Sequence, residues 1–100
     1  MKTRIICYDI ESDNVRTVLA KRLEALGFIR IQYSVFCGSH NDTQWTRCHD
    51  IVEDLLKDKM TETDKVYILQ IPPVALRKML YFGEELEIDE ILGTKKVLWI

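Results

Sequence analysis

The chain has 100 residues, of which 47% are hydrophobic and 30% are charged. This length predicts one domain spanning residues 1–100, and this composition is typical of a globular protein and not of a disordered one. The formal net charge is −2, whereas proteins that bind nucleic acid by themselves are usually basic. We therefore expect this chain, on its own, to bind nucleic acid weakly.

The apolar segments of the sequence are short. None approaches the ~20 residues that a membrane-spanning helix requires. The apolar stretch after Lys2 and Arg4 ends at Asp9, too soon for a signal peptide. The three cysteines form an odd and sparse set that suits reduced thiols better than disulfides. We expect a cytoplasmic protein without a membrane partner.

The first predicted strand, Arg4–Ile10, is apolar on both faces. A half-solvated antiparallel strand would alternate between apolar and polar residues. We therefore expect the sheet to be covered on both sides, by helices on one side and by a partner subunit on the other. Ser12, Asp13 or Asn14 can cap a following helix, whose apolar residues keep helical spacing until Gly27.

The segment Phe28–Cys37 alternates with a period of two. It is long for one strand, which predicts a bend or a split near Tyr33–Ser34. A turn over Gly38–Thr43 and a second helix are expected to follow. The core-like face of the segment carries Ile29, Ile31, Tyr33, Val35 and Cys37.

The second half of the chain is expected to contain shorter elements. Lys65–Ile71 reads as a strand that a pair of prolines ends, and Val74–Leu80 as one or two helical turns. Tyr81 and Phe82 are expected to open a short strand, and Lys95–Ile100 to form the final one. The residues between them, 84–94, show no firm period.

This order of elements, βαββαβ, is that of an α+β, ferredoxin-like domain. We expect its core at residues 1–83. Residues 84–100 are expected to form an extension whose short carboxy-terminal strand docks on the partner subunit of a homodimer.

Asp9 is the first candidate for chemistry. It ends a hydrophobic strand on the face shared with Ile5 and Cys7, where a carboxylate needs a hydrogen-bond partner, a cation or water. One aspartate is a poor metal site, but two that meet across a dimer axis would hold one Mg²⁺ or Mn²⁺ ion with bound waters. The alternative is that Asp9 only caps the following loop.

Two arginines are further candidates. Arg16, on the first turn of the first helix, can reach a phosphate or pair with a neighbouring acid. Arg30 projects with Gln32 and Ser34 from one strand face, which can meet phosphates, a partner subunit or only solvent.

Cysteines and histidines occur near one another in the middle of the sequence. Their spacing is not that of a known zinc site, and the adjacent Cys48 and His49 point about 100° apart on a helix. We expect no zinc. The residues concerned are Cys37, His40, Cys48 and His49.

One string of residues points to a family. GFIRIQYSVF at residues 27–36, with Tyr8, Asp9 and Ile10 ending the first strand and Arg16 after it, resembles the small CRISPR-associated Cas2 family. The resemblance covers nearly the whole chain. It implies a ferredoxin-like homodimer, packed sheet to sheet, that joins the CRISPR integrase and holds duplex DNA (the protospacer) during spacer acquisition in antiviral defence.

The resemblance also implies site residues. Some members of the family are Mg²⁺-dependent endonucleases on single-stranded RNA or on DNA. In those members the aspartate that matches Asp9 binds the metal and acts in catalysis with the residue that matches Tyr8. Residues that match Arg16, Arg30 and Phe36 contact the nucleic acid.

Three functions remain open from the sequence. The first is an adaptor in the DNA-integration complex, and the second is a metal-dependent endonuclease that uses Asp9. The third is a toxin-like, metal-dependent ribonuclease of the virulence-associated D type, which also forms a small dimer of this fold. Whether the chain is an enzyme is thus undecided at this stage.

Overall fold

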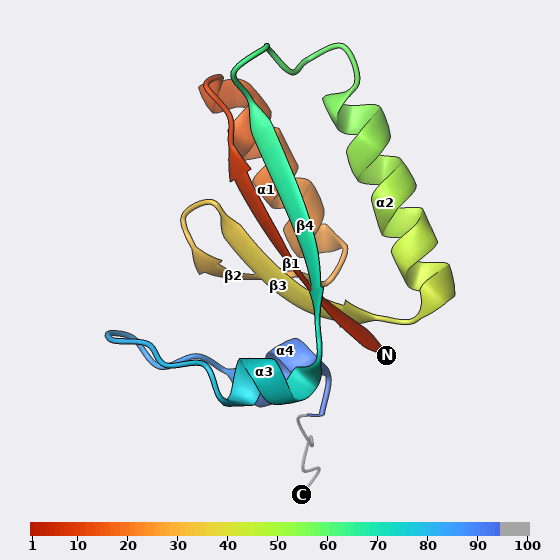
Figure 1. Ribbon diagram of the computed structural model, residues 1–100. Coiled ribbons are helices and arrows are strands. Elements are labelled where there is room, and N and C mark those ends of the chain that lie inside the picture. The colour runs from red at the N-terminus through yellow and green to blue at the C-terminus, as the bar shows by residue number, and fades with distance from the viewer. Residues whose placement is uncertain (95–100) are drawn as a thin grey trace, which may run out of the picture.

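The fold is built on one antiparallel sheet. In the computed structural model we describe residues 1–94, so the predicted strand Lys95–Ile100 lies outside the described residues. The strand order is β2-β3-β1-β4, which places the first strand in the middle and leaves β4 at an edge (Figure 1). The strands are β1 (Lys2–Asp9), β2 (Ile29–Gln32), β3 (Val35–His40) and β4 (Lys65–Ile71).

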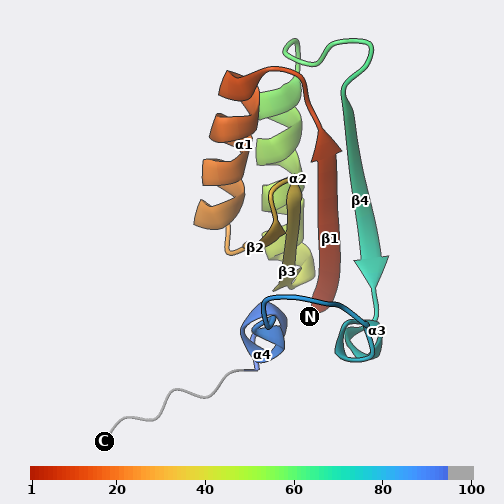
Figure 2. The ribbon, with the colours of Figure 1, turned by 90° about the vertical axis from the view of Figure 1, so that its left-hand side faces the viewer.

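Two long helices, α1 (Asp13–Ala25) and α2 (Asp42–Leu56), cover one face of this sheet (Figure 2). The Ser12 side chain caps α1 by accepting a hydrogen bond from the Val15 amide. A reciprocal pair of bonds between Asn41 and Gln44 forms a capping box at the start of α2. The order βαββαβ confirms the predicted ferredoxin-like α+β fold. None of the helices described is long and apolar enough to cross a bilayer.

The main core lies between the sheet and these two helices. Ile6 and Phe36, from the two central strands, have no exposed surface, and neither do Leu19 and Leu23 of α1. Because burial of one such side chain contributes about 1.5–3 kcal/mol, this layer is the principal source of stability.

The opposite face of the sheet, here called the open face, is covered only at one end. Two short helices pack there, α3 (Pro73–Arg77) and α4 (Ile88–Leu92). An ion pair of 2.9 Å between Arg77 and Asp89 joins them. They enclose a second, smaller core. The chain itself therefore covers part of the face that we expected a partner subunit to cover. The buried members of this second core are Cys37, Leu76, Ile91 and Leu92.

The rest of the open face stays exposed. Tyr67 and Leu69 of β4 are 61% and 51% exposed. Beside them on β1 and β3 lie the half-buried Cys7 and Val35, which pair with each other in register, while Cys7 also pairs with Tyr67. We call these four residues the open strip.

The β2–β3 hairpin confirms the predicted split at Tyr33–Ser34 and corrects two details. The predicted turn over Gly38–Thr43 is wrong in its first half, because β3 continues through His40 in register with β1. The placement of Tyr33 on the core-like face is also wrong. Tyr33 is 71% exposed because it occupies the turn, where strand alternation no longer applies.

The predicted short strand at Tyr81 and Phe82 is wrong as well. Both residues lie in the loop between α3 and α4, and Phe82 is fully exposed. β4 ends at Ile71 and α3 begins at Pro73, so the chain has left the sheet before it reaches Tyr81. The helical turns at α3 confirm the expectation for Val74–Leu80, whereas α4 arises in the segment that showed no period.

Candidate functional site

Asp9 is exposed at the end of β1 and faces Lys65 across the β1–β4 ladder. Its neighbour Tyr8 is buried on the helix side, so strand alternation places Asp9 on the open face, as the sequence indicates.

Within residues 1–94, no three His, Cys, Asp or Glu side chains lie close enough to hold a metal ion. Because Mg²⁺ takes about six oxygen ligands, a single copy of the chain supplies too few. Water molecules and a carboxylate from a second copy would have to complete the set.

Arg16 holds the turn that follows Asp9. Its guanidinium donates hydrogen bonds to the carbonyl oxygens of Ile10 and Glu11, the second at 2.8 Å, and forms an ion pair with Asp13. The predicted pairing with a neighbouring acid is therefore present. Most of the hydrogen-bonding capacity of Arg16 is used within the chain, so this side chain orients the backbone beside Asp9.

Asp64 holds the same turn from the other side. One carboxylate oxygen accepts from the Glu11 amide at 3.0 Å and the other from the Thr61 amide at 2.9 Å. These backbone bonds, Thr61 first and then Glu11, lower the pKa of Asp64 below its usual value of 3.8. Sequence reasoning missed Asp64, because its partner lies 53 positions earlier in the chain. The only signal was a polar loop before β4.

Tyr8, Arg16 and Arg30 come together in one cleft of about 360 Å³ between α1 and the β2–β3 hairpin. Tyr33 forms part of its rim. Lys21 and Glu24, from the exposed side of α1, line it as well. The cleft therefore combines three cations with two aromatic rings and one carboxylate.

Phe36 lies beneath this cleft and not in it. Its side chain is fully buried and stacks on Tyr8, with ring centroids 6.2 Å apart and an angle of 17° between the rings. The guanidinium of Arg30 lies over the same ring, 5.0 Å from its centroid. In this position Phe36 supports Arg30 and has no surface with which to touch a ligand.

The cleft and Asp9 lie on opposite faces of the sheet but at the same end. The Tyr8 amide donates a 3.1 Å hydrogen bond to the Ser34 carbonyl, which fastens the hairpin turn beside the last residues of β1. The structure thus brings Tyr8, Arg16 and Arg30 together in the cleft. Tyr8 and Arg30 lie on the face of the sheet opposite Asp9, whereas Arg16 also bonds to the turn that follows Asp9.

The four residues that superficially resembled zinc ligands do not converge. His40 is bonded through Nε2 to the Leu26 carbonyl at 2.7 Å, and His49 lies beside Glu53 on the surface of α2. Cys48 belongs to the main core and Cys37 to the second one. Burial raises the pKa of the Cys37 thiol to about 11, so this side chain behaves as an apolar core residue.

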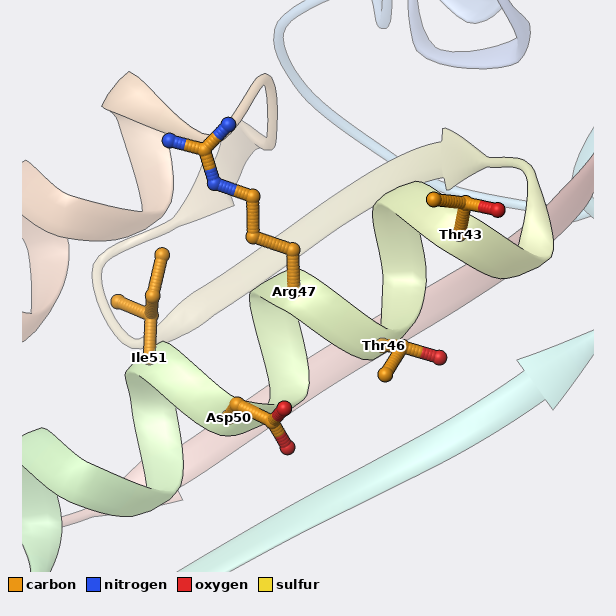
Figure 3. Close-up of a pocket in the computed structure, with 5 residues that line it drawn as sticks. All are labelled: Thr43, Thr46, Arg47, Asp50 and Ile51. Carbon is orange, nitrogen blue, oxygen red and sulfur yellow. The ribbon is translucent and has the colours of Figure 1, made fainter.

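A broader hollow of about 570 Å³ runs along α2. Its lining residues all come from this one helix, and Figure 3 shows Arg47 and Ile51 extending away from Thr46 and Asp50. These side chains do not face one another across a cavity, so we assign no function to this hollow.

Comparison with known proteins identifies the family. The sequence model of the family described as "CRISPR associated protein Cas2" matches residues 1–79. A protein of Methanospirillum hungatei JF-1, named CRISPR-associated endoribonuclease Cas2 1, is 33% identical over 86 residues, which cover 86% of this chain and 87% of the relative. A protein of the same name from Francisella tularensis subsp. novicida is 33% identical over 70 residues, or 70% and 68% of the two chains.

A solved structure shares the fold. The crystal structure of Streptococcus pyogenes Cas2 at pH 6.5 superposes with a TM-score of 0.66, at 17% identity, over 81% of this chain and 99% of that one. The match over residues 1–79 and the relatives with 33% identity lead to one conclusion: the chain belongs to the CRISPR-associated protein family Cas2.

Proposed function

We propose that the protein is a homodimeric adaptor of CRISPR spacer acquisition, which joins the CRISPR integrase and holds duplex DNA. The observation that carries this proposal is the open strip. Tyr67 and Leu69, on the edge strand β4, expose more than half of their surface on the open face. Contiguous exposed apolar surface of this kind is typical of an interaction site.

A second copy of the chain suits the open strip best. Two-fold packing would place the strip against itself, since a two-fold interface uses the same patch on both subunits. Asp9 and Lys65 lie at one end of the strip, in register with each other. An apolar centre with a polar rim is the usual anatomy of a protein interface.

A metal-dependent endonuclease is the second candidate, favoured by the exposure of Asp9 at that rim and by the name endoribonuclease that both relatives carry. Two Asp9 carboxylates brought together across the dimer axis would hold one Mg²⁺ or Mn²⁺ ion. Such an ion activates water and polarises a phosphodiester. The contribution of this chain is to fix the direction of Asp9 through the turn that Arg16 and Asp64 hold.

The adaptor is tested by Leu69→Asp, which places a charge in the open strip. We expect a monomer in sedimentation velocity and loss of co-elution with the integrase and duplex DNA. Val74→Asp is the matched control, because Val74 is 53% exposed on α3, outside the strip. A Leu69→Asp protein that remains dimeric would show that the open strip is not the interface. A monomer that still captures DNA with the integrase would separate dimerisation from the adaptor role.

The endonuclease is tested by Asp9→Asn, assayed on single-stranded RNA and duplex DNA with Mg²⁺, Mn²⁺ or a chelator. The second candidate requires metal-dependent cleavage that this variant loses and that Asp54→Asn, an exposed acid on α2, retains. Cleavage that survives Asp9→Asn or the chelator would indicate a contaminating nuclease. Expression toxicity relieved by Asp9→Ala, without any integrase, would instead favour the toxin-like ribonuclease.

A further inference from the structure

Lys65 lies directly opposite Asp9 on the neighbouring strand. The β1–β4 register pairs these two residues. Directly opposite residues of an antiparallel pair direct their side chains to the same face, with Cβ atoms about 4.5–5.5 Å apart. Both residues are exposed, and they share the open face at the end of the sheet opposite α3 and α4 (Figure 2). An acid and a base therefore face solvent side by side at the rim of the open strip.

Two other charged side chains at this end of the sheet already have partners. Arg16 pairs with Asp13, and both carboxylate oxygens of Asp64 accept hydrogen bonds from backbone amides. Neither Asp9 nor Lys65 forms an ion pair in the described part of the chain. In the single chain each therefore lacks a counter-ion, and the register offers each the other across the β1–β4 ladder.

A second copy that covers the open strip changes the surroundings of both charges. An exposed ion pair contributes little, because water screens it and the two side chains lose conformational freedom. Removal of water at an interface makes an uncompensated carboxylate costly and strengthens the attraction between opposite charges. Once covered, Asp9 needs a cation, which either Lys65 or a divalent ion can supply.

We propose that Lys65 competes with a divalent cation for Asp9, and that the Asp9–Lys65 pair is the form in which this carboxylate enters the dimer interface. The Lys65 ammonium neutralises the carboxylate of each subunit, so the dimer forms without a metal ion. A Mg²⁺ or Mn²⁺ ion on Asp9 is repelled by the lysine beside it. The inference rests on the proposed homodimer and names the charge pair and the competitor that regulate its metal site.

Exchange of the two charges tests the pair. Asp9→Lys and Lys65→Asp each place like charges opposite one another, and each is expected to raise the dissociation constant of the homodimer about 2- to 100-fold, as coupled neighbours do. The double variant Asp9→Lys/Lys65→Asp restores opposite charges and should dimerise nearly as tightly as the wild type. Sedimentation velocity in buffer with a chelator measures all four proteins. Losses that simply add in the double variant would overturn the pair.

Metal binding tests the competition without any measurement of cleavage. Titration with Mn²⁺ alone, followed by the loss of the electron paramagnetic resonance signal of the free ion, gives the affinity of each variant. Lys65→Gln should bind Mn²⁺ about 3- to 15-fold more tightly, because it removes a positive charge about 5 Å from the carboxylate. Asp9→Asn should lose this binding. Lys78→Gln makes the same change on an exposed lysine after α3 and should bind like the wild type.

The outcomes separate this inference from the proposed function. A wild type that stays monomeric contradicts the homodimer itself, and with it the interface pair. A wild-type dimer without rescue in the double variant, or with the same Mn²⁺ affinity in Lys65→Gln, overturns the inference and leaves the homodimer standing. A wild-type dimer that dissociates in the chelator would also overturn it, because a metal ion and not Lys65 would then neutralise Asp9.

Discussion

The two faces of the sheet differ in how completely the chain covers them. On the helix side, Ile6 and Phe36 have no exposed surface beneath α1 and α2. On the open face, α3 and α4 cover one end, and Tyr67 and Leu69 at the other are more than half exposed. Both faces carry apolar side chains on the same strands, so hydrophobicity along the sequence does not reveal which apolar surface serves folding and which is free for association.

The difference also separates the two sets of functional candidates. The aromatic and basic cleft lies on the well-packed side, where Phe36 and Tyr8 give it a rigid floor. Asp9 lies on the side that the chain leaves incomplete. A site on a rigid support can bind a ligand within one subunit, whereas a site at an exposed edge depends on what covers that edge.

The largest expected effect is on the helix side. Phe36→Ala removes a fully buried ring that supports both Tyr8 and Arg30, and should lower the free energy of unfolding by about 3–5 kcal/mol in urea denaturation. Leu80→Ala, at a residue that is 93% exposed, is the control and should change it by less than about 0.5 kcal/mol. Similar losses in the two variants would contradict the packing described for this face.

Thiol reactivity distinguishes the end of the open face that α3 and α4 cover from the open strip, which they leave exposed. Cys7 is half-buried in the open strip, whereas Cys37 is buried beneath α3 and α4 with a pKa raised from 9.0 to about 11. A rise of two pKa units lowers the thiolate fraction of Cys37 about 100-fold near neutral pH. With iodoacetamide we expect Cys7 to react first, and faster in the Leu69→Asp protein than in the wild type.

Peptide mapping after timed alkylation locates the modified thiols, and Cys7→Ser is the control that should remove the rapid phase. Rapid modification of Cys37 in the native protein would mean that α3 and α4 leave the sheet readily. Equal rates for Cys7 in the wild type and in Leu69→Asp would mean that the open strip is not covered by a second copy.

The smallest expected effect concerns the turn beside Asp9. The folded pKa of Asp64 lies below its usual value of 3.8 because backbone amides donate to it. Its contribution to stability is therefore present above pH 3.8 and is lost as the pH falls through the lowered folded value. Asp64→Asn should be less stable than the wild type at neutral pH, and this gap should narrow below pH 3.8. Urea denaturation at both pH values measures it, with Asp54→Asn as the control.

Local signals in the sequence predicted most of the fold. Alternation and turn residues located the four strands of the sheet, and the caps Ser12 and Asn41 lie where the helices begin. The end of β3 was misjudged because Gly38 and Ser39 are typical turn residues, yet they pair with Arg4 and Thr3 of β1. Sheet partners 34 and 36 positions away in the chain cannot be predicted from the local sequence.

The candidate site was predictable only in part. The face of Asp9 followed from strand alternation, and the acidic partner of Arg16 lay within one helical turn. The role of Asp64 could not be predicted from the sequence, since it depends on how the loop before β4 meets the turn after β1. The exposure of Tyr33 was missed because this residue lies in the hairpin turn, where the alternation of inward and outward side chains in β2 and β3 does not apply.

The central position of β1 has a consequence for synthesis of the chain. β1 is translated first, but its two neighbours in the sheet are β3 and β4, and its last residues pair with Val66 and Lys65. Pairings between distant segments are slow to form. Chains that expose apolar strands before these pairings form are prone to aggregation. On the ribosome, the edge of β1 that pairs with β4 therefore stays without its partner until residue 71 has emerged.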